Sequence, residues 1–138
     1  MIGIVIVAHG GLAHEYLAAM EHVVGKHPGT ASVAIEVDDD CGEKQAEIDA
    51  AVSAVDQGEG VVVVTDMFGS TPSNLAIGAC RETPGRRVLY GANLPLLVKL
   101  AKLRDKPLNV AVASALTAGR KYINCIDGNE PNGTPVPL

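Results

Sequence analysis

Two short, uninterrupted runs of mainly β-branched residues constrain the fold of this chain more than any other feature of its sequence. Residues 2–8 are Ile-Gly-Ile-Val-Ile-Val-Ala, and residues 61–65 are Val-Val-Val-Val-Thr. A half-exposed strand would alternate apolar and polar residues, so continuous runs of this length are typical of strands buried on both faces of a parallel sheet. Such a sheet needs helices on both sides, which predicts an α/β fold.

The rest of the chain alternates between helical and strand patterns. Apolar residues at helical spacing predict helices over residues 12–24, 43–55, 71–80 and 95–103, and short β-type segments predict strands over 32–37 and 87–90. Residues 108–118 fit either period, but their length and the Gly119 that follows favour a helix with a glycine cap. This order predicts a single-domain doubly wound sheet of about four parallel strands with helices on both faces.

The C-terminal part of the chain differs from the rest. Residues 122–126, Tyr-Ile-Asn-Cys-Ile, fit a final antiparallel edge strand. Residues 127–138 contain three prolines, two glycines and two asparagines, a composition typical of a flexible tail. We therefore expect one domain over residues 1–126, followed by a tail over residues 127–138.

Composition excludes several classes of function. The net charge is -5 and no cluster of Lys or Arg occurs, which argues against a nucleic-acid partner. The three cysteines are widely spaced and form no Cys-x-x-Cys pair, so neither a disulfide framework nor a metal site is predicted. The apolar run at residues 2–8 is only seven residues long and has no basic residue before it, which is unlike a signal peptide or a membrane span, so we expect a cytoplasmic protein.

His9 and Asp66 directly follow the two buried runs. The carboxyl ends of parallel strands share one edge of a sheet, where ligands and chemistry are found near the point at which strand order reverses. A neutral histidine can accept a phosphoryl group on one ring nitrogen if the other nitrogen carries the proton. A carboxylate can hold that tautomer and stabilise the charge that develops on the ring. The sequence therefore predicts His9 as phosphoryl acceptor and Asp66 as the residue that orients it.

Donors for the phosphoryl oxygens are available nearby in the sequence. The hydroxyls of Ser70, Thr71 and Ser73 lie at the start of an expected helix, whose free amides also suit an anion. Gly10 leaves His9 uncovered by a side chain, and Asn93, next to another helix start, is a further candidate contact. This scheme requires neither a metal nor a cofactor.

Three segments together resemble the IIA component (EIIA) of the mannose, fructose and sorbose type of the phosphoenolpyruvate-dependent sugar phosphotransferase system (PTS). They are residues 4–10 (Ile-Val-Ile-Val-Ala-His-Gly), 65–74 (Thr-Asp-Met-Phe-Gly-Ser-Thr-Pro-Ser-Asn) and 91–96 (Gly-Ala-Asn-Leu-Pro-Leu). The resemblance implies that His9 receives its phosphoryl group from the carrier HPr and passes it to an EIIB partner. It also implies a homodimer in which the strand over residues 122–126 is exchanged, and only indirect membrane association through EIIC and EIID.

Three alternatives stay open at this point. The same site could belong to a regulatory phosphoprotein of an incomplete PTS, whose phosphorylation state controls a partner protein. A receiver-like module would instead be phosphorylated on Asp66, with the acidic residues 38–40 holding Mg²⁺. A flavodoxin-like domain would use residues 70–73 for a flavin phosphate, although only Phe68 and three tyrosines are available to stack on a flavin.

Overall fold

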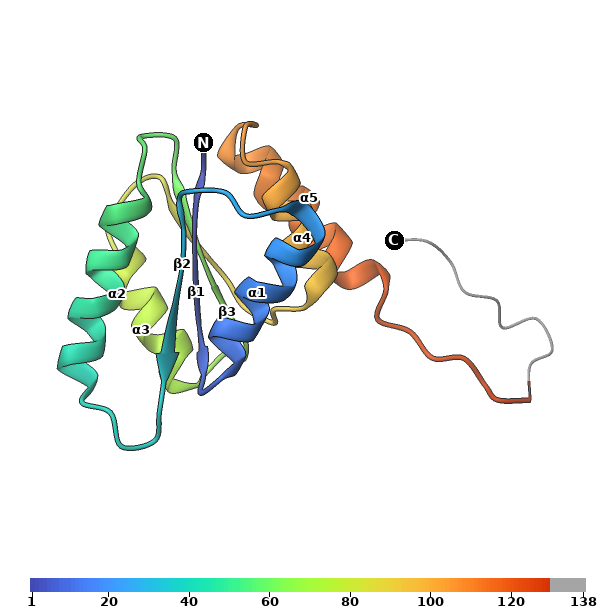
Figure 1. Cartoon of the computed structure of the whole chain (residues 1–138), viewed down its shortest axis with the longest axis horizontal. Coiled ribbons are helices and arrows are strands. Elements are labelled where there is room, and N and C mark those ends of the chain that lie inside the picture. The colour runs from blue at the N-terminus through green and yellow to red at the C-terminus, as the bar shows by residue number, and fades with distance from the viewer. Residues whose placement is uncertain (130–138) are drawn as a thin grey trace.

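The computed structural model describes residues 1–129 and shows a four-stranded parallel sheet between two layers of helices (Figure 1). The strands are β1 (Gly3–His9), β2 (Thr30–Ile35), β3 (Val61–Thr65) and β4 (Arg86–Leu89), in the order β2-β1-β3-β4. All three pairings are parallel, with β1 between β2 and β3. The predicted α/β fold class is confirmed.

Helices cover both faces of the sheet, which explains why β1 and β3 are apolar up to their last residues, His9 and Thr65. Helices α1 (Leu12–Val24), α4 (Leu94–Lys102) and α5 (Leu108–Lys121) lie on one face, and α2 (Cys41–Val55) and α3 (Thr71–Cys80) lie on the other (Figure 1). Within β1, Ile4 and Ile6 belong to the core under the first group, whereas Val5 and Val7 belong to the core under the second. No helix within residues 1–129 has the length and apolar character needed to cross a membrane.

Two helices differ from the sequence-based prediction by two or more residues at one end. Helix α2 begins at Cys41 and not at residue 43, because Asp40 caps it: its Oδ1 accepts a hydrogen bond of 3.0 Å from the amide of Glu43. Residues 108–118 are confirmed as a helix, but Gly119 lies inside α5 and not at its cap. A β-carbon at residue 119 would lie 3.1 Å from the side chain of Leu96, so glycine permits the close packing of α5 on α4.

Residues 122–129, the last ones that the structure describes, form no strand in the single chain. Tyr122 follows α5 as a turn residue, and residues 123–127 leave the body of the molecule without regular secondary structure (Figure 1). Within the described part of the chain, β4 pairs with β3 alone and so forms an edge of the sheet. An exchanged strand over residues 122–126 stays a prediction, because it concerns a second subunit. Of the expected tail, residues 130–138 lie outside the described residues.

A buried arginine holds together the end of the sheet at which β1 and β3 begin. Arg104 is only 3% exposed and lies between α4 and α5. Its guanidinium donates hydrogen bonds to the carbonyls of Ile2, Pro28 and Gly29 at 2.8, 2.9 and 3.1 Å. Its own carbonyl accepts a hydrogen bond of 2.8 Å from the amide of Ile2. The N-terminal end of β1 is therefore tied to the loop before β2 and to the helical layer.

Candidate functional site

The carboxyl ends of β1 and β3 bring His9 and Asp66 together. His9 is the last residue of β1, and Asp66 directly follows β3, its neighbour in the sheet. The chain runs outward from β1 to β2 on one side and from β3 to β4 on the other, so strand order reverses between β1 and β3. The predicted adjacency of strands one and three is confirmed, and the two residues lie at the switch point where open α/β sheets place their sites.

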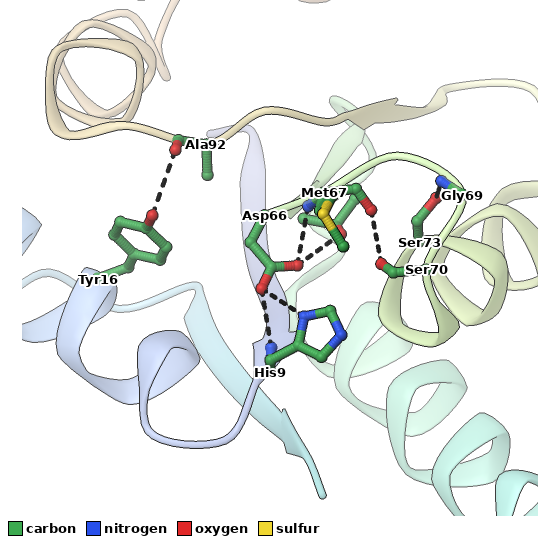
Figure 2. A network of polar contacts seen from close by, with 9 residues as sticks. His9, Tyr16, Asp66, Met67, Gly69, Ser70, Ser73 and Ala92 are labelled. Carbon is green, nitrogen blue, oxygen red and sulfur yellow. Dashed lines mark hydrogen bonds and ion pairs between the residues drawn. The ribbon is translucent and has the colours of Figure 1, made fainter. Parts of the chain in front are cut away.

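The carboxylate of Asp66 makes two hydrogen bonds to His9 (Figure 2). Its Oδ2 lies 2.7 Å from Nδ1 of the His9 ring and accepts a second bond of 3.0 Å from the His9 amide. The side chain of Asp66 is only 9% exposed, whereas that of His9 is 48% exposed. An ionised carboxylate can only accept, so Nδ1 must carry the proton. The lone pair is then on Nε2, in a ring that is half open to solvent.

The other carboxylate oxygen of Asp66 also accepts hydrogen bonds. Its Oδ1 accepts hydrogen bonds from the Met67 amide at 2.9 Å and from the Thr65 hydroxyl at 3.4 Å. Burial alone would raise the pKa of Asp66, but hydrogen bonds from the amide and ring of His9 outweigh it and hold this pKa below the ordinary value of 3.8. Asp66 therefore stays ionised and keeps its role as acceptor throughout the neutral range.

The lowered pKa of Asp66 predicts how its contribution to stability varies with pH. A carboxyl group whose pKa is lower in the folded state stabilises the fold above its unfolded pKa of about 3.9, and the stabilisation is lost as pH falls through the folded pKa. We therefore expect the difference in unfolding free energy between wild type and Asp66→Asn to shrink as pH decreases below about 4. Urea denaturation at a series of pH values measures it, and a difference that does not change with pH would contradict the assigned hydrogen bonds.

Gly10 shapes the turn between β1 and α1 and leaves the acceptor histidine open. Its φ angle of 50° lies in the left-handed region, which favours glycine, and its amide donates a hydrogen bond of 2.9 Å to the carbonyl of Ile35. The chain therefore turns at once after His9 without placing a side chain over the imidazole. The role of Gly10 beside a phosphoryl group stays a prediction.

The hydroxyls of Ser70 and Ser73 are engaged within the loop before α3 (Figure 2). Ser70 Oγ donates a hydrogen bond of 2.6 Å to the carbonyl of Met67, and Ser73 Oγ accepts one of 3.2 Å from the amide of Gly69. Ser73 is also fully buried. These two side chains stabilise the conformation of the loop. The loop in turn positions the start of α3 beside His9.

Thr71 is the expected donor that the structure places beside His9. It is exposed at the first position of α3, and it lines a pocket of about 370 Å³ together with His9 and Gly10. Pro72 follows it, and the first-turn amides of a helix have no acceptor inside the helix. The side chain of Thr71 and the helix start therefore offer donors on one wall of the pocket.

Asn93 has a different position from the one expected. Its Oδ1 accepts a hydrogen bond of 3.0 Å from the amide of Leu96 and caps α4, while its Nδ2 donates one of 2.8 Å to the carbonyl of Gly119 in α5. It does not line the pocket at His9. Both polar atoms of Asn93 therefore join α4 to α5.

Sequence reasoning missed the wall of the pocket formed after β2 and by α2. The pocket that His9 and Thr71 line is also lined by Glu36, Asp39, Cys41 and Lys44. The acidic residues 38–40 suggested only a solvated loop or a cation site, and the helix was expected to start later. Asp40 followed by Glu43, a capping pair at the spacing of a helix start, is the signal that would have placed α2 correctly.

Comparison with known proteins gives a consistent match along the chain. The family model of the PTS system fructose IIA component matches residues 3–116. The chain is 25% identical over 127 residues to the PTS system mannose-specific EIIAB component of Escherichia coli (strain K12). That alignment covers 91% of this chain but 39% of the relative, so the chain spans well under half the length of that protein.

Solved structures agree with the computed fold. The mannose/sorbose specific IIA subunit of the phosphotransferase system from Enterococcus faecalis has a TM-score of 0.81 and 26% identity, covering 93% of this chain and 96% of that one. The phosphotransferase system component EIIA from Streptococcus agalactiae has the same TM-score of 0.81 at 23% identity, covering 91% and 97%. At 23% identity, the similarity to the Streptococcus agalactiae structure supports the fold alone.

Proposed function

The chain belongs to the family of PTS system fructose IIA components, and from this premise we propose that it is a histidine phosphocarrier. In this proposal, Nε2 of His9 accepts a phosphoryl group from phosphorylated HPr and passes it to an EIIB partner. The observation that carries the proposal is the 2.7 Å contact between Nδ1 of His9 and Asp66, which leaves Nε2 as the nucleophile at an open surface.

The transfer step balances with the groups at this site. The Nε2 lone pair of His9 attacks the phosphorus, a new N–P bond forms, and the N–P bond of the donor histidine breaks with its electron pair returning to the donor ring. The positive charge that develops on the His9 ring is shared with the Nδ1 proton, which Asp66 accepts in a hydrogen bond. Donors at Thr71 and the start of α3 face the phosphoryl oxygens. Transfer to EIIB reverses these steps.

Exposed apolar residues near the site support a protein as phosphoryl donor and acceptor. Met67 and Phe68, which follow Asp66, are exposed, and the Phe68 ring lies 4.6 Å from that of the exposed Tyr90. Exposed aromatic and methionine side chains are enriched in protein interfaces. They give a partner an apolar contact area beside His9.

The hydrogen bonds and burial of Asp66 support the proposal that His9, and not Asp66, is the phosphorylated residue. Both oxygens of Asp66 already accept hydrogen bonds, and its side chain is largely buried, so an acyl phosphate there would break those bonds. Two of the three acidic residues at 38–40 are also engaged: Asp40 caps α2, and Asp39 accepts a hydrogen bond of 2.7 Å from the amide of Glu36. Within residues 1–129 no group of three or more His, Cys, Asp or Glu gathers in a way that could hold a metal ion.

Phosphorylation by the general PTS enzymes tests the proposal. We expect the purified chain to gain the mass of one phosphoryl group when incubated with phosphoenolpyruvate, enzyme I and HPr, and to gain none when HPr is omitted. The His9→Ala variant should gain none under any condition. His14→Ala is the matched control, because His14 is an exposed histidine on α1 and should leave the mass gain unchanged. A wild-type chain that stays at its original mass would overturn the proposal.

A regulatory role would use the same phosphorylation site. Transport requires that phosphorylated chain transfers its group to an EIIB domain, so mixing the isolated phosphoprotein with candidate EIIB proteins separates the two roles. Rapid loss of the phosphoryl mass to an EIIB protein supports the carrier role in sugar uptake. Retention of the group in the presence of every EIIB protein of the source organism would favour regulation.

A further inference from the structure

Lys44 lies in the pocket beside the phosphoryl acceptor. It lines the 370 Å³ pocket together with His9 and Thr71, so its side chain and the start of α3 form two walls of one cavity next to the imidazole. Among residues 1–129, Lys44 is the one lysine or arginine that lines this pocket. A cation in this position faces the space that a group on His9 would enter.

Helix α2, which carries Lys44, packs against helix α3, which carries Thr71. Gln45, the next residue of α2, donates a hydrogen bond of 3.1 Å to the carbonyl of Leu75 in α3. The two helices also pack closely there, because a β-carbon at Gly78 would lie 2.7 Å from the side-chain oxygen of Gln45. The distance between α2 and α3, and so the width of the pocket, is therefore set by the fold.

Acidic residues hold the Lys44 ammonium in the unphosphorylated chain. Its Nζ donates to Glu47 at 2.9 Å and lies 3.8 Å from Asp39, with the side chain 22% exposed. The hydrogen bond to Glu47 is the largest cause of a raised pKa, so Lys44 stays charged at neutral pH. Glu47 is exposed and Asp39 is partly exposed, and ion pairs of this kind contribute little stability. Lys44 can therefore exchange these carboxylates for a more highly charged phosphoryl group at a small cost in free energy.

Phosphorylation of His9 changes the balance of charge in this pocket. Glu36 and Asp39 also line it, and with Lys44 they give a net charge of about -1 before any phosphoryl group arrives. A phosphoryl group adds about -1.5 to -2. Without Lys44 the charged side chains that line the pocket would be the carboxylates of Glu36 and Asp39, and like charges at short distance destabilise one another.

We propose that Lys44 releases Glu47 and Asp39 and binds the phosphoryl group that His9 carries. This inference rests on the proposed function, because it assigns a further phosphoryl-binding residue to the same site. Lys44 forms no covalent bond to the phosphoryl group. Its N–H groups donate hydrogen bonds to the phosphoryl oxygens. Lys44 thereby raises the share of phosphoryl groups that reside on this chain when it exchanges with HPr.

The partition of phosphoryl groups between HPr and this chain tests the inference. Equal amounts of the two proteins are equilibrated with limiting phosphoenolpyruvate and catalytic enzyme I, and the phosphorylated fractions are read from intact masses. We expect Lys44→Gln to shift the equilibrium toward HPr by about tenfold, as for one lost charge-assisted contact. Lys44→Arg keeps the charge and should restore most of the wild-type partition. Lys106→Gln, an exposed lysine between α4 and α5, controls for net charge.

A second variant separates phosphoryl binding from a merely structural role. Glu47→Gln removes the main tether of Lys44 but keeps the cation, so we expect a partition equal to wild type or shifted toward this chain. If Lys44 acted only by tying down α2, Glu47→Gln and Lys44→Gln would have the same effect, which would overturn the inference. In ³¹P NMR titrations the second pKa of the phosphoryl group should be higher in Lys44→Gln than in wild type, because a nearby cation favours the dianion.

The two proposals fail in distinguishable ways. A wild-type chain that takes no phosphoryl group overturns the proposed function, and the role of Lys44 with it. A wild-type chain phosphorylated on His9, with the same partition and the same phosphoryl pKa in Lys44→Gln, overturns the role of Lys44 alone.

Discussion

Replacing Asp66 by asparagine is expected to slow phosphoryl transfer to His9 by about 10²–10⁴-fold, the range known for loss of an orienting carboxylate or general base. The reason is that all the hydrogen-bond partners of this carboxylate are donors. Oδ2 accepts from the amide and ring of His9, and Oδ1 accepts from Met67 and Thr65. The side chain of asparagine has an NH₂ group in place of one oxygen, and it must point that group either toward the His9 donors or toward the donors of Met67 and Thr65.

Either orientation of that asparagine harms the site. With NH₂ toward His9, the ring accepts at Nδ1 and carries its proton on Nε2, so the nucleophilic lone pair is lost. With NH₂ toward Met67, two donors oppose each other at a site that spans 2.9 Å in the native chain. The negative charge that stabilises the phosphorylated ring is lost in both cases.

The rate of HPr-dependent mass gain, followed over time by intact-mass spectrometry, measures this effect. Asp105→Asn is the matched control, because it removes the same charge from an exposed residue next to Arg104, at the opposite end of the sheet. We expect the control to match wild type. Transfer to Asp66→Asn at the wild-type rate would show that the contact of 2.7 Å does not orient the acceptor.

Replacing Arg104 by methionine is expected to lower the free energy of unfolding by about 3 kcal/mol, as several hydrogen bonds to a charged group are lost. Methionine fills a similar volume but donates nothing to the carbonyls of Ile2, Pro28 and Gly29. The buried guanidinium has no carboxylate partner among these contacts, so its removal also relieves some desolvation, which limits the loss. The end of the sheet where β1 begins should open first.

Urea denaturation of Arg104→Met measures this loss, with Arg81→Met as the exposed control expected to change the unfolding free energy by less than about 0.5 kcal/mol. Under conditions where the variant is folded, its rate of phosphorylation by HPr should equal that of wild type, because Arg104 lies at the edge opposite to His9. A loss below about 1 kcal/mol would show that water replaces the guanidinium at these carbonyls.

The sequence was sufficient to predict the sheet and the central pair of residues. Continuous apolar runs gave the two buried strands, and parallel strands must bring the residues that follow them to one edge. His9 and Asp66 could be placed together for that reason, without any knowledge of side-chain contacts. The resemblance to a family of phosphocarriers then added the chemistry of the acceptor.

Contacts between elements distant in the sequence were out of reach. The position of Lys44 beside His9 depends on the packing of α2 against α3, which a helical period does not reveal. Ser73 and Asn93 were reasonable donors by residue type, but hydrogen bonds inside the loop and between helices use them. Arg104 follows a helix in a polar stretch that suggests a surface turn, and only the folded chain brings three carbonyls around it.

The position of the phosphoryl group on the His9 ring is the most direct test of this account. The chain, labelled with ¹⁵N-histidine and phosphorylated by HPr, is examined by two-dimensional ¹H–¹⁵N NMR, in which coupling to phosphorus identifies the bonded nitrogen. The hydrogen bond from Nδ1 to Asp66 predicts a phosphoryl group on Nε2 of His9, with the proton retained on Nδ1. A phosphoryl group on Nδ1, on another histidine or on Asp66 would contradict it.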